Sequence, residues 1–178
     1  MTHIRTACID DIPIIQDIAY KTWPLAFKDI LEPKQIDYML EMMYSTSSLS
    51  EQISSKGHTF ILSFIYISKK TEKDSYNSEC RYTGYSSYEI NVAGSLKTKI
   101  HKLYVLPKYQ GRGCGKEMLK EVQKIARSKN SEILSLNVNR NNKAVDFYKS
   151  FGFKVVKEEN INIGNGFLME DFVMEKVL

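Results

Sequence analysis

The chain has 178 residues, 43% of them hydrophobic and 26% charged, and a formal net charge of +4. With only nine glycines and four prolines, this is the composition of one soluble globular domain spanning residues 1–178, and it excludes a disordered or fibrous chain. No run approaches the roughly 18 apolar residues of a membrane-spanning helix, and the first residues lack a signal-peptide pattern, so we expect a cytoplasmic protein without membrane contacts.

The first half of the chain predicts short elements. Residues 2–7 suit a strand, and a helix enters through Pro13, with Pro24 bending or ending it. A second helix starts at Pro33. The apolar faces of these helices are Ile14, Ile15, Ile18 and Ala19 in the first, and Ile36, Met39, Leu40 and Met43 in the second. The remaining expectations are a serine-rich connection over 45–50, a buried strand over 59–67, a long, mobile hairpin loop over 68–81 and a strand over 82–92.

In the second half, strands and helices alternate. We expect strands over 98–106 and 132–138, helices over 115–129 and 142–150, and closing strands over 153–156 and 172–177. Antiparallel strands first and a β-α-β-α-β run later indicate an α/β (α+β) fold, in which helices flank a mixed, mostly antiparallel sheet.

A glycine-rich turn joins the strand over 98–106 to the next helix. Gly111, Gly113 and Gly115 allow positive φ and leave backbone N–H groups uncovered, and the start of the helix adds its dipole. The turn therefore predicts a phosphate site. It is not a Rossmann turn, because the spacing is G-x-G-x-G, and it is not a P-loop, because Glu117 follows Lys116.

The turn lies in a basic block, residues 97–130, with ten Lys or Arg against two Glu. Such a block attracts nucleic acid or a phosphorylated cofactor, or its lysines merely solvate a helix face. The widely spaced Cys8, Cys80 and Cys114, and the three histidines, form no disulfide framework or metal site. We expect reduced thiols and no metal.

Two signatures carry a resemblance to a known family. Gln110-Gly-Arg-Gly-Cys-Gly115 resembles the pyrophosphate loop of the GNAT superfamily of N-acetyltransferases, and Asn141-Asn-Lys-Ala-Val-Asp-Phe-Tyr148-Lys-Ser-Phe-Gly-Phe153 resembles its second signature. The resemblance is strong over 98–156. It implies the GNAT fold, with two parallel strands that splay apart around acetyl-CoA, and direct transfer of the acetyl group to an amine in a ternary complex.

The resemblance also implies roles for single residues. The cofactor would be bound by Leu103, Val105, Gln110, Gly111, Arg112, Gly113, Cys114, Gly115, Lys116 and Asn141. Asn141 is equally well explained as a helix N-cap. Tyr148 aligns with the acid that protonates the departing thiolate, and a core aromatic is its alternative. Lys99 and Asn137 stand where some relatives carry glutamates, so His101 becomes the candidate base, on the face of Leu103 if the strand alternates regularly.

The acceptor is less defined. Residues 1–56 hold eight acidic against five basic residues, and Trp23, Phe27 and Glu32 lie where the acceptor groove should be. This region is loosely similar to bacterial polyamine acetyltransferases and suits a polyamine or other small amine. A peptide N-terminus, a homodimer, and a non-catalytic module that binds CoA or nucleic acid stay open, although no recognised nucleic-acid motif is present.

Overall fold

The computed structural model describes residues 1–70 and 76–178, with the backbone alone at 69, 70, 76 and 77. Three short 3₁₀ turns interrupt the regular elements, at Ile9–Asp11, Val92–Gly94 and Pro107–Tyr109. The regular elements in chain order are β1 (His3–Thr6), α1 (Ile12–Phe27), α2 (Pro33–Tyr44), α3 (Thr46–Ser54), β2 (Thr59–Lys70), β3 (Tyr76–Glu89), β4 (Lys97–Val105), α4 (Cys114–Ser128), β5 (Ile133–Asn139), α5 (Ala144–Ser150), β6 (Lys154–Gly164) and β7 (Phe167–Val177).

All seven strands form one sheet in the order β1-β2-β3-β4-β5-β7-β6. Every neighbouring pair is antiparallel except β4 and β5, which are parallel. Parallel neighbours need a crossover, and α4 supplies it. The sheet is therefore mixed and mostly antiparallel, as the sequence predicts.

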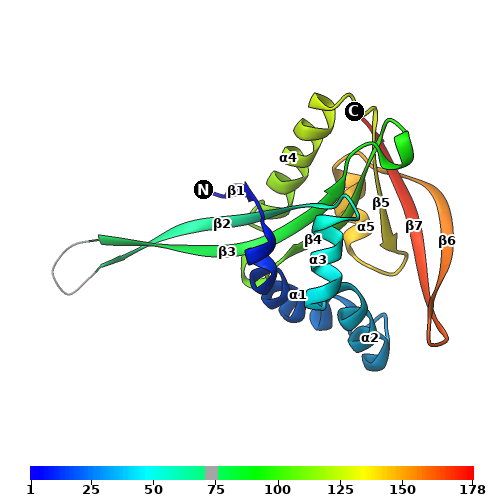
Figure 1. Ribbon diagram of the computed structural model, residues 1–178, viewed down its shortest axis with the longest axis horizontal. Helices are drawn as coiled ribbons and strands as arrows, with labels where there is room; N and C mark the ends of the chain where they lie inside the picture. The colour runs from blue at the N-terminus through cyan, green and yellow to red at the C-terminus, as the bar shows by residue number, and fades with distance from the viewer. Residues whose placement is uncertain (71–75) are drawn as a thin grey trace.

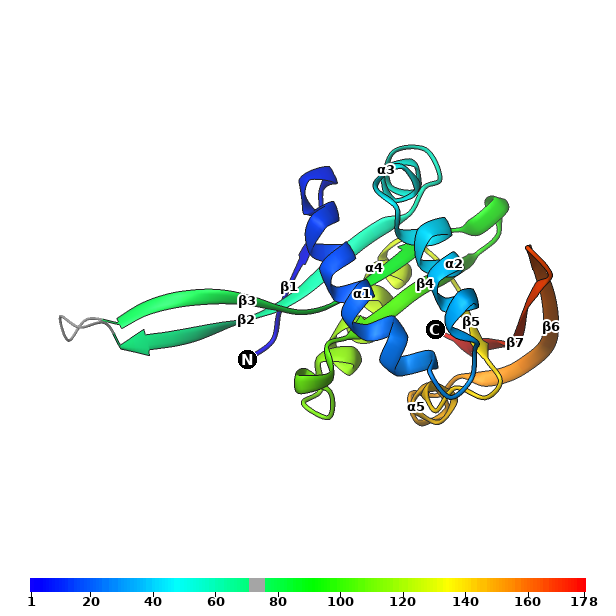
Figure 2. The same cartoon turned by 90° about the horizontal axis from the view of Figure 1, so that it is seen from below.

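Helices α1, α2 and α3 cover one face of the sheet, and α4 and α5 lie on the other (Figures 1 and 2). The first face is packed with aromatic residues, among them Trp23, Tyr44, Phe60 and Tyr85. The second face is mainly aliphatic, with Met118 and the apolar side of α4 against β2, β3 and β4. None of the helices in the described ranges is long and apolar enough to span a membrane.

Two details of the first face differ from expectation. Pro24 was expected to bend or end the first helix, and the second alternative is wrong, because α1 continues to Phe27. Pro24 lies on the exposed side, where the Tyr20 carbonyl that loses its N–H partner can meet water, while Trp23 and Phe27 are buried on the other side. The serine-rich stretch is not a connection but helix α3, because Ser45 caps it by accepting from the Ser48 N–H and its Leu49 is fully buried.

The expected loop over 68–81 is mostly strand. Strands β2 and β3 run on to Lys70 and from Tyr76, and together they form a long hairpin that extends away from the rest of the molecule (Figure 1). The polar residues of this stretch show no alternation with apolar ones, so the pattern that marks a half-buried strand is missing there. The tip of the expected loop, residues 71–75, lies outside the described residues.

The N-terminal corner is closed by an ion pair between the partly exposed Arg5 and the buried Asp11. Asp11 accepts from both guanidinium nitrogens of Arg5, at 2.6 and 2.7 Å, and from the Cys8 N–H at 2.9 Å. Arg5 also donates to the Tyr82 hydroxyl at 2.6 Å. Hydrogen bonding to Arg5 lowers the pKa of Asp11 from 3.8 to about 2. This carboxylate has a purely structural explanation.

Candidate active site

The glycine turn has the open geometry expected of an anion site. Gly111 and Gly113 have φ of 72° and 84°, and a Cβ at either would meet nothing within 4 Å. Gly113 is the N-cap of the 15-residue helix α4, so the first N–H groups of that helix point into the same open space. Arg112 and Lys116 are exposed beside it. The turn can hold a phosphorylated group, because its glycines carry no side chain that would fill the space.

The other turn residues support this shape. Gln110 donates from its side-chain amide to the Val105 carbonyl at 3.0 Å and so ties the turn to the end of β4. Gly115 packs closely, since a Cβ there would lie 3.5 Å from the Phe147 ring. Cys114 is buried, with its sulfur 3.6 Å from the Thr2 hydroxyl. Cys114 therefore contributes packing to the turn.

Strands β4 and β5 pair over only part of their length. The pairs run from Lys97↔Ile133 to Ile100↔Leu136, and no pair joins the strands beyond them in the described residues. The Leu106 N–H donates to Thr83 on the β3 side, so by alternation the N–H groups of Leu103 and Val105 point to the opposite, unpaired side. This opening between the strands leads from the glycine turn toward the middle of the sheet.

A β-bulge lies where the opening begins. Ser87 pairs with Lys102 and Tyr88 with Ile100, which leaves His101 as the extra residue. The bulge breaks the regular alternation, so the expected shared face of His101 and Leu103 is lost. Leu103 packs with the α4 side, whereas His101 turns to Glu89 and His58.

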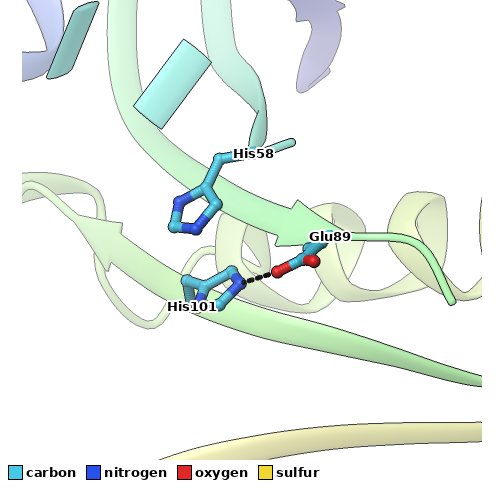
Figure 3. A group of neighbouring side chains, drawn as sticks. All are labelled: His58, Glu89 and His101. Atoms are coloured by element: carbon cyan, nitrogen blue, oxygen red, sulfur yellow. Dashed lines mark hydrogen bonds and ion pairs between the residues drawn. The ribbon is translucent and has the colours of Figure 1, made fainter. Parts of the chain in front are cut away.

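His101 is held by these two neighbours (Figure 3). Its Nε2 lies 3.1 Å from the Glu89 carboxylate, and its ring stacks on His58 at 3.9 Å with an interplanar angle of 12°. An ionised carboxylate only accepts, so neutral His101 donates from Nε2 and keeps its lone pair on Nδ1. Burial, with Lys102 and Lys99 nearby, lowers the pKa of His101 from 6.5 to about 4. His101 is thus neutral at physiological pH.

Potential metal ligands also gather here. In the described ranges, one ligand atom each of His58, Glu89 and His101 lie within 4.8 Å of one another, close enough for a metal ion. Sequence spacing gave no sign that His58 and His101 meet. Imidazole lone pairs lie in the ring plane, so two nearly parallel rings direct them side by side rather than at one point. The arrangement is that of an oriented histidine, and a shared ion would require one ring to turn.

A cavity of about 150 Å³ lies beside the opening, and we call it the wedge cavity. It is lined by residues from α1, α2, β4, β5, α5, β7 and the connections α1–α2 and β5–α5: Trp23, Phe27, Leu31, Met39, Met43, Tyr44, Ile100, His101, Lys102, Leu103, Tyr104, Leu136, Asn137, Val138, Asn139, Asn142, Ala144, Tyr148, Met169 and Asp171. The cavity brings together Tyr148, His101, Leu103, Trp23 and Phe27 from the residues proposed from sequence.

Tyr148 lines this cavity from α5. It is 8% exposed, between Phe147 and Phe153, and no described residue hydrogen-bonds its hydroxyl. Burial raises the pKa of this phenol above 10. Tyr148 therefore carries its proton at physiological pH, which a general acid must.

The remaining expected residues lie at the rim. Glu32 and Asn141 are exposed and line a neighbouring hollow of about 390 Å³, which shares Leu31 and Asn139 with the wedge cavity. Asn141 does not cap α5, because the Ala144 N–H donates to the side chain of Asn142 instead. Trp23 donates to the Tyr44 hydroxyl at 3.1 Å, so its indole has a structural role as well as a face on the cavity.

Two buried charged residues of the cavity were missed from the sequence. Lys102 donates to the Gln52 side chain at 2.6 Å and lies over the Tyr44 and Phe60 rings, and burial lowers its pKa to about 8. Asp171 is 1% exposed, and its Oδ1 has no hydrogen-bond partner among the described residues. Burial raises the pKa of Asp171 from 3.8 to about 6. A strand beginning at 167 rather than 172 would have included Asp171, but on the same face as Glu175, so the sequence alone would not have singled it out.

Comparisons with known proteins agree with this geometry. The family model described as the acetyltransferase (GNAT) domain matches residues 31–176. The chain is 26% identical to the spermidine N(1)-acetyltransferase of Thermoplasma acidophilum over 175 residues, which cover 98% of this chain and 96% of that protein.

Two solved structures share the fold. One is the PaiA N-acetyltransferase of Thermoplasma acidophilum in complex with coenzyme A, with a TM-score of 0.76 at 24% identity over 100% of this chain and 99% of that chain. The other is the ribosomal-protein-S18-alanine N-acetyltransferase of Escherichia coli, with a TM-score of 0.66 at 14% identity over 99% and 94%.

Proposed function

This chain belongs to the GNAT family and is an acetyltransferase, and we propose that it moves the acetyl group of acetyl-CoA directly onto the primary amine of a small acceptor such as a polyamine. The observation that carries the proposal is the opening between β4 and β5, which joins the glycine turn to the wedge cavity holding Tyr148. The spermidine acetyltransferase that resembles the chain over 98% of its length supports an amine of this class.

The residues that would bind acetyl-CoA fit the group. The N–H groups of the turn at Gly111, Gly113 and the start of α4 would hold the pyrophosphate, with Arg112 and Lys116 adding charge. The N–H groups of Leu103 and Val105, unpaired on the β5 side, would hold the amide-containing arm as another strand would. Acetyl-CoA supplies an activated acyl group, and the Leu103 N–H is proposed to polarise its carbonyl.

Two side chains would move protons. Tyr148 would donate its hydroxyl proton to the thiolate as it leaves, which a phenol can do in a water-poor site. His101 would accept the proton of the attacking amine at Nδ1, directly or through water, while Glu89 holds its other nitrogen. Glu32 and Asn141 at the rim would contact the acceptor and the cofactor.

Cofactor binding is tested by thermal unfolding. Acetyl-CoA at 100 times its Kd should stabilise the protein by about 2.7 kcal/mol, which raises the Tm by roughly 5–10 °C. Gly113→Asp should abolish the rise, because its carboxylate would face the phosphates. Gly94→Asp is the matched control, since Gly94 also has a positive φ and open space but lies outside the turn. A Tm unmoved by millimolar acetyl-CoA would contradict the proposal.

Acetyl transfer is tested by thiol release from acetyl-CoA with a panel of diamines, polyamines, monoamines and peptides with free N-termini. We expect the highest kcat/KM with a small amine. A preference for peptides would correct the acceptor class and leave acetyl transfer standing. Binding of a random oligonucleotide in place of acetyl-CoA would favour the nucleic-acid alternative.

A further inference from the structure

We propose that Asp171 is the acceptor anchor of this enzyme: its unpartnered carboxylate oxygen holds the acceptor nitrogen as an alkylammonium ion in the wedge cavity. The inference rests on the proposed function, because it places the acceptor in the cavity that contains Tyr148. It adds a residue to the site and defines the charge of the group that the site selects.

Burial without a partner is the first observation. Ionised carboxylates are almost never fully buried unless they are paired, and leaving a buried acceptor atom unsatisfied costs about 1–3 kcal/mol. Asp171 is 1% exposed, yet its Oδ1 accepts no hydrogen bond from the described residues. A structural carboxylate would have its partners built into the fold, as Asp11 has. For Asp171, we infer that a ligand supplies the missing hydrogen-bond donor.

The position of Asp171 is the second observation. It lies on β7 opposite Asn139 of β5 and lines the same cavity as Tyr148. Tyr104 lies close to both residues. Burial and Tyr44 are the main causes that raise the pKa of Tyr104, and Tyr148 and Asp171 raise it further. A nitrogen bound to Asp171 therefore lies in the chamber where the proposed acid stands.

The charged residues around Asp171 do not neutralise it by a direct ion pair. Lys99 and Arg140 lie near enough to lower its pKa and Glu159 near enough to raise it, while Asn137 contributes a hydrogen bond. Arg140 donates to Glu158 and Asn160 from its two terminal nitrogens, its buried Nε has no partner among the described residues, and Asn137 also donates to Glu159. The buried Lys102 is held by Gln52 instead. Within the described part of the chain, no cation is thus paired directly with Asp171.

The chemistry of the cavity fits an alkylammonium group. Its walls include the rings of Trp23, Phe27 and Tyr104, and aromatic faces attract cations. A single carboxylate among apolar and aromatic surfaces selects a cationic nitrogen over a neutral group of the same size, because only the cation compensates the buried charge. The preferred acceptor is therefore a primary alkylamine that enters as the ammonium ion and passes a proton toward Nδ1 of His101, which lines the same cavity, before it attacks the thioester.

Direct binding tests the anchor without requiring turnover. Titration of CoA-saturated protein with butylamine and putrescine should show that Asp171→Asn weakens both by about 10–100-fold, the range for a hydrogen bond to a charged group. Butanol, a neutral counterpart, should bind both proteins equally weakly. Asp37→Asn, an exposed aspartate on α2, is the matched control and should leave the affinities unchanged.

Two readouts separate an anchor from a structural residue. The acetyl-CoA thermal shift of Asp171→Asn should equal that of the wild type, and with the best amine of the panel the variant should lose kcat/KM mainly through KM. Wild-type amine affinity in Asp171→Asn, or no alkylammonium binding by the wild type, would overturn the anchor. Amine binding that depends on Asp171, with no acetyl transfer to any acceptor, would keep the anchor and refute the proposed function.

Discussion

Asp11 at the N-terminal corner and Asp171 in the wedge cavity are the same residue type, both buried, with opposite pKa shifts. Asp11 is surrounded by donors from Arg5 and Cys8, and its pKa falls to about 2. Asp171 has an unpartnered oxygen, and its pKa rises to about 6. The contrast teaches that burial alone does not identify a functional carboxylate. What identifies it is burial that the fold leaves uncompensated.

Tyr148 and Tyr85 show the same contrast between a buried polar group without a partner and one with a partner. Replacing the first should give the largest change in activity. Tyr148→Phe removes an unpartnered hydroxyl from the cavity, so turnover should fall about 10²–10⁴-fold, the range of general acid catalysis, with acetyl-CoA affinity retained. Tyr85→Phe is the matched control, because Tyr85 does not line the cavity and its hydroxyl already has a partner, the Tyr44 hydroxyl at 2.8 Å. It should cost about 1 kcal/mol of stability and little activity. Wild-type turnover in Tyr148→Phe would make Tyr148 a packing residue.

Replacing each aspartate by asparagine should change stability in opposite directions. The pKa of Asp171 rises from 3.8 to about 6, so its ionisation costs the folded state roughly 3 kcal/mol above pH 6, and Asp171→Asn should raise the free energy of unfolding at pH 7 by about 1–3 kcal/mol. Asp11→Asn should lower it by about 1–2 kcal/mol, since Arg5 is partly exposed and its interaction is screened. Urea unfolding at pH 7 measures both.

The pH dependence of stability gives the same signs. Between pH 6 and 4 folded Asp171 binds a proton more tightly than the unfolded chain, so its contribution becomes less unfavourable as the pH falls. The contribution of Asp11 is present above about pH 4 and is lost as the pH falls through about 2. A loss of stability in Asp171→Asn would assign this residue to structure and break the contrast.

The pH profile of activity should separate Asp171 from His101. Protonation of Asp171 as the pH falls through about 6 should raise KM for the amine, and protonation of His101 near pH 4 should lower kcat. Deprotonation of the acceptor amine should also change the rate, but at a higher pH that moves with the pKa of the amine chosen. Because a histidine with so low a pKa is a weak base, we expect His101→Gln to cost only about 10-fold in kcat. If His101→Gln keeps both limbs and the wild-type kcat, the proton leaves by another route.

The smallest effect is expected at Glu89. Glu89→Gln keeps a hydrogen-bond acceptor for His101 but removes the charge that fixes which nitrogen carries the proton. We expect a loss of a few-fold in kcat, with KM for both substrates unchanged. An effect as large as that of Tyr148→Phe would show that Glu89 does more than orient the ring.

The sequence predicted the second half of the molecule well and the first half less well. Local signals agree with the structure around Gly113 and Tyr148, because the glycine turn and the α5 signature are short and contiguous. Asp171 and Lys102 could not be recognised as site residues, since their burial arises from strands far apart in the chain. The bulge at His101 also left no local signal, because it depends on the register with β3.

The partial pairing of β4 and β5 gives the sheet an edge in its interior. Only four residue pairs, Lys97↔Ile133 to Ile100↔Leu136, connect the strands before the opening with those after it. Such a junction can bend, and the amide-containing arm of acetyl-CoA, bound between the two strands, would make it more rigid. Amide protons of Leu103 and Val105 should therefore exchange with solvent fast in the free enzyme and slowly once acetyl-CoA fills the gap. In the proposed binding mode, acetyl-CoA would therefore act as a removable strand of the sheet.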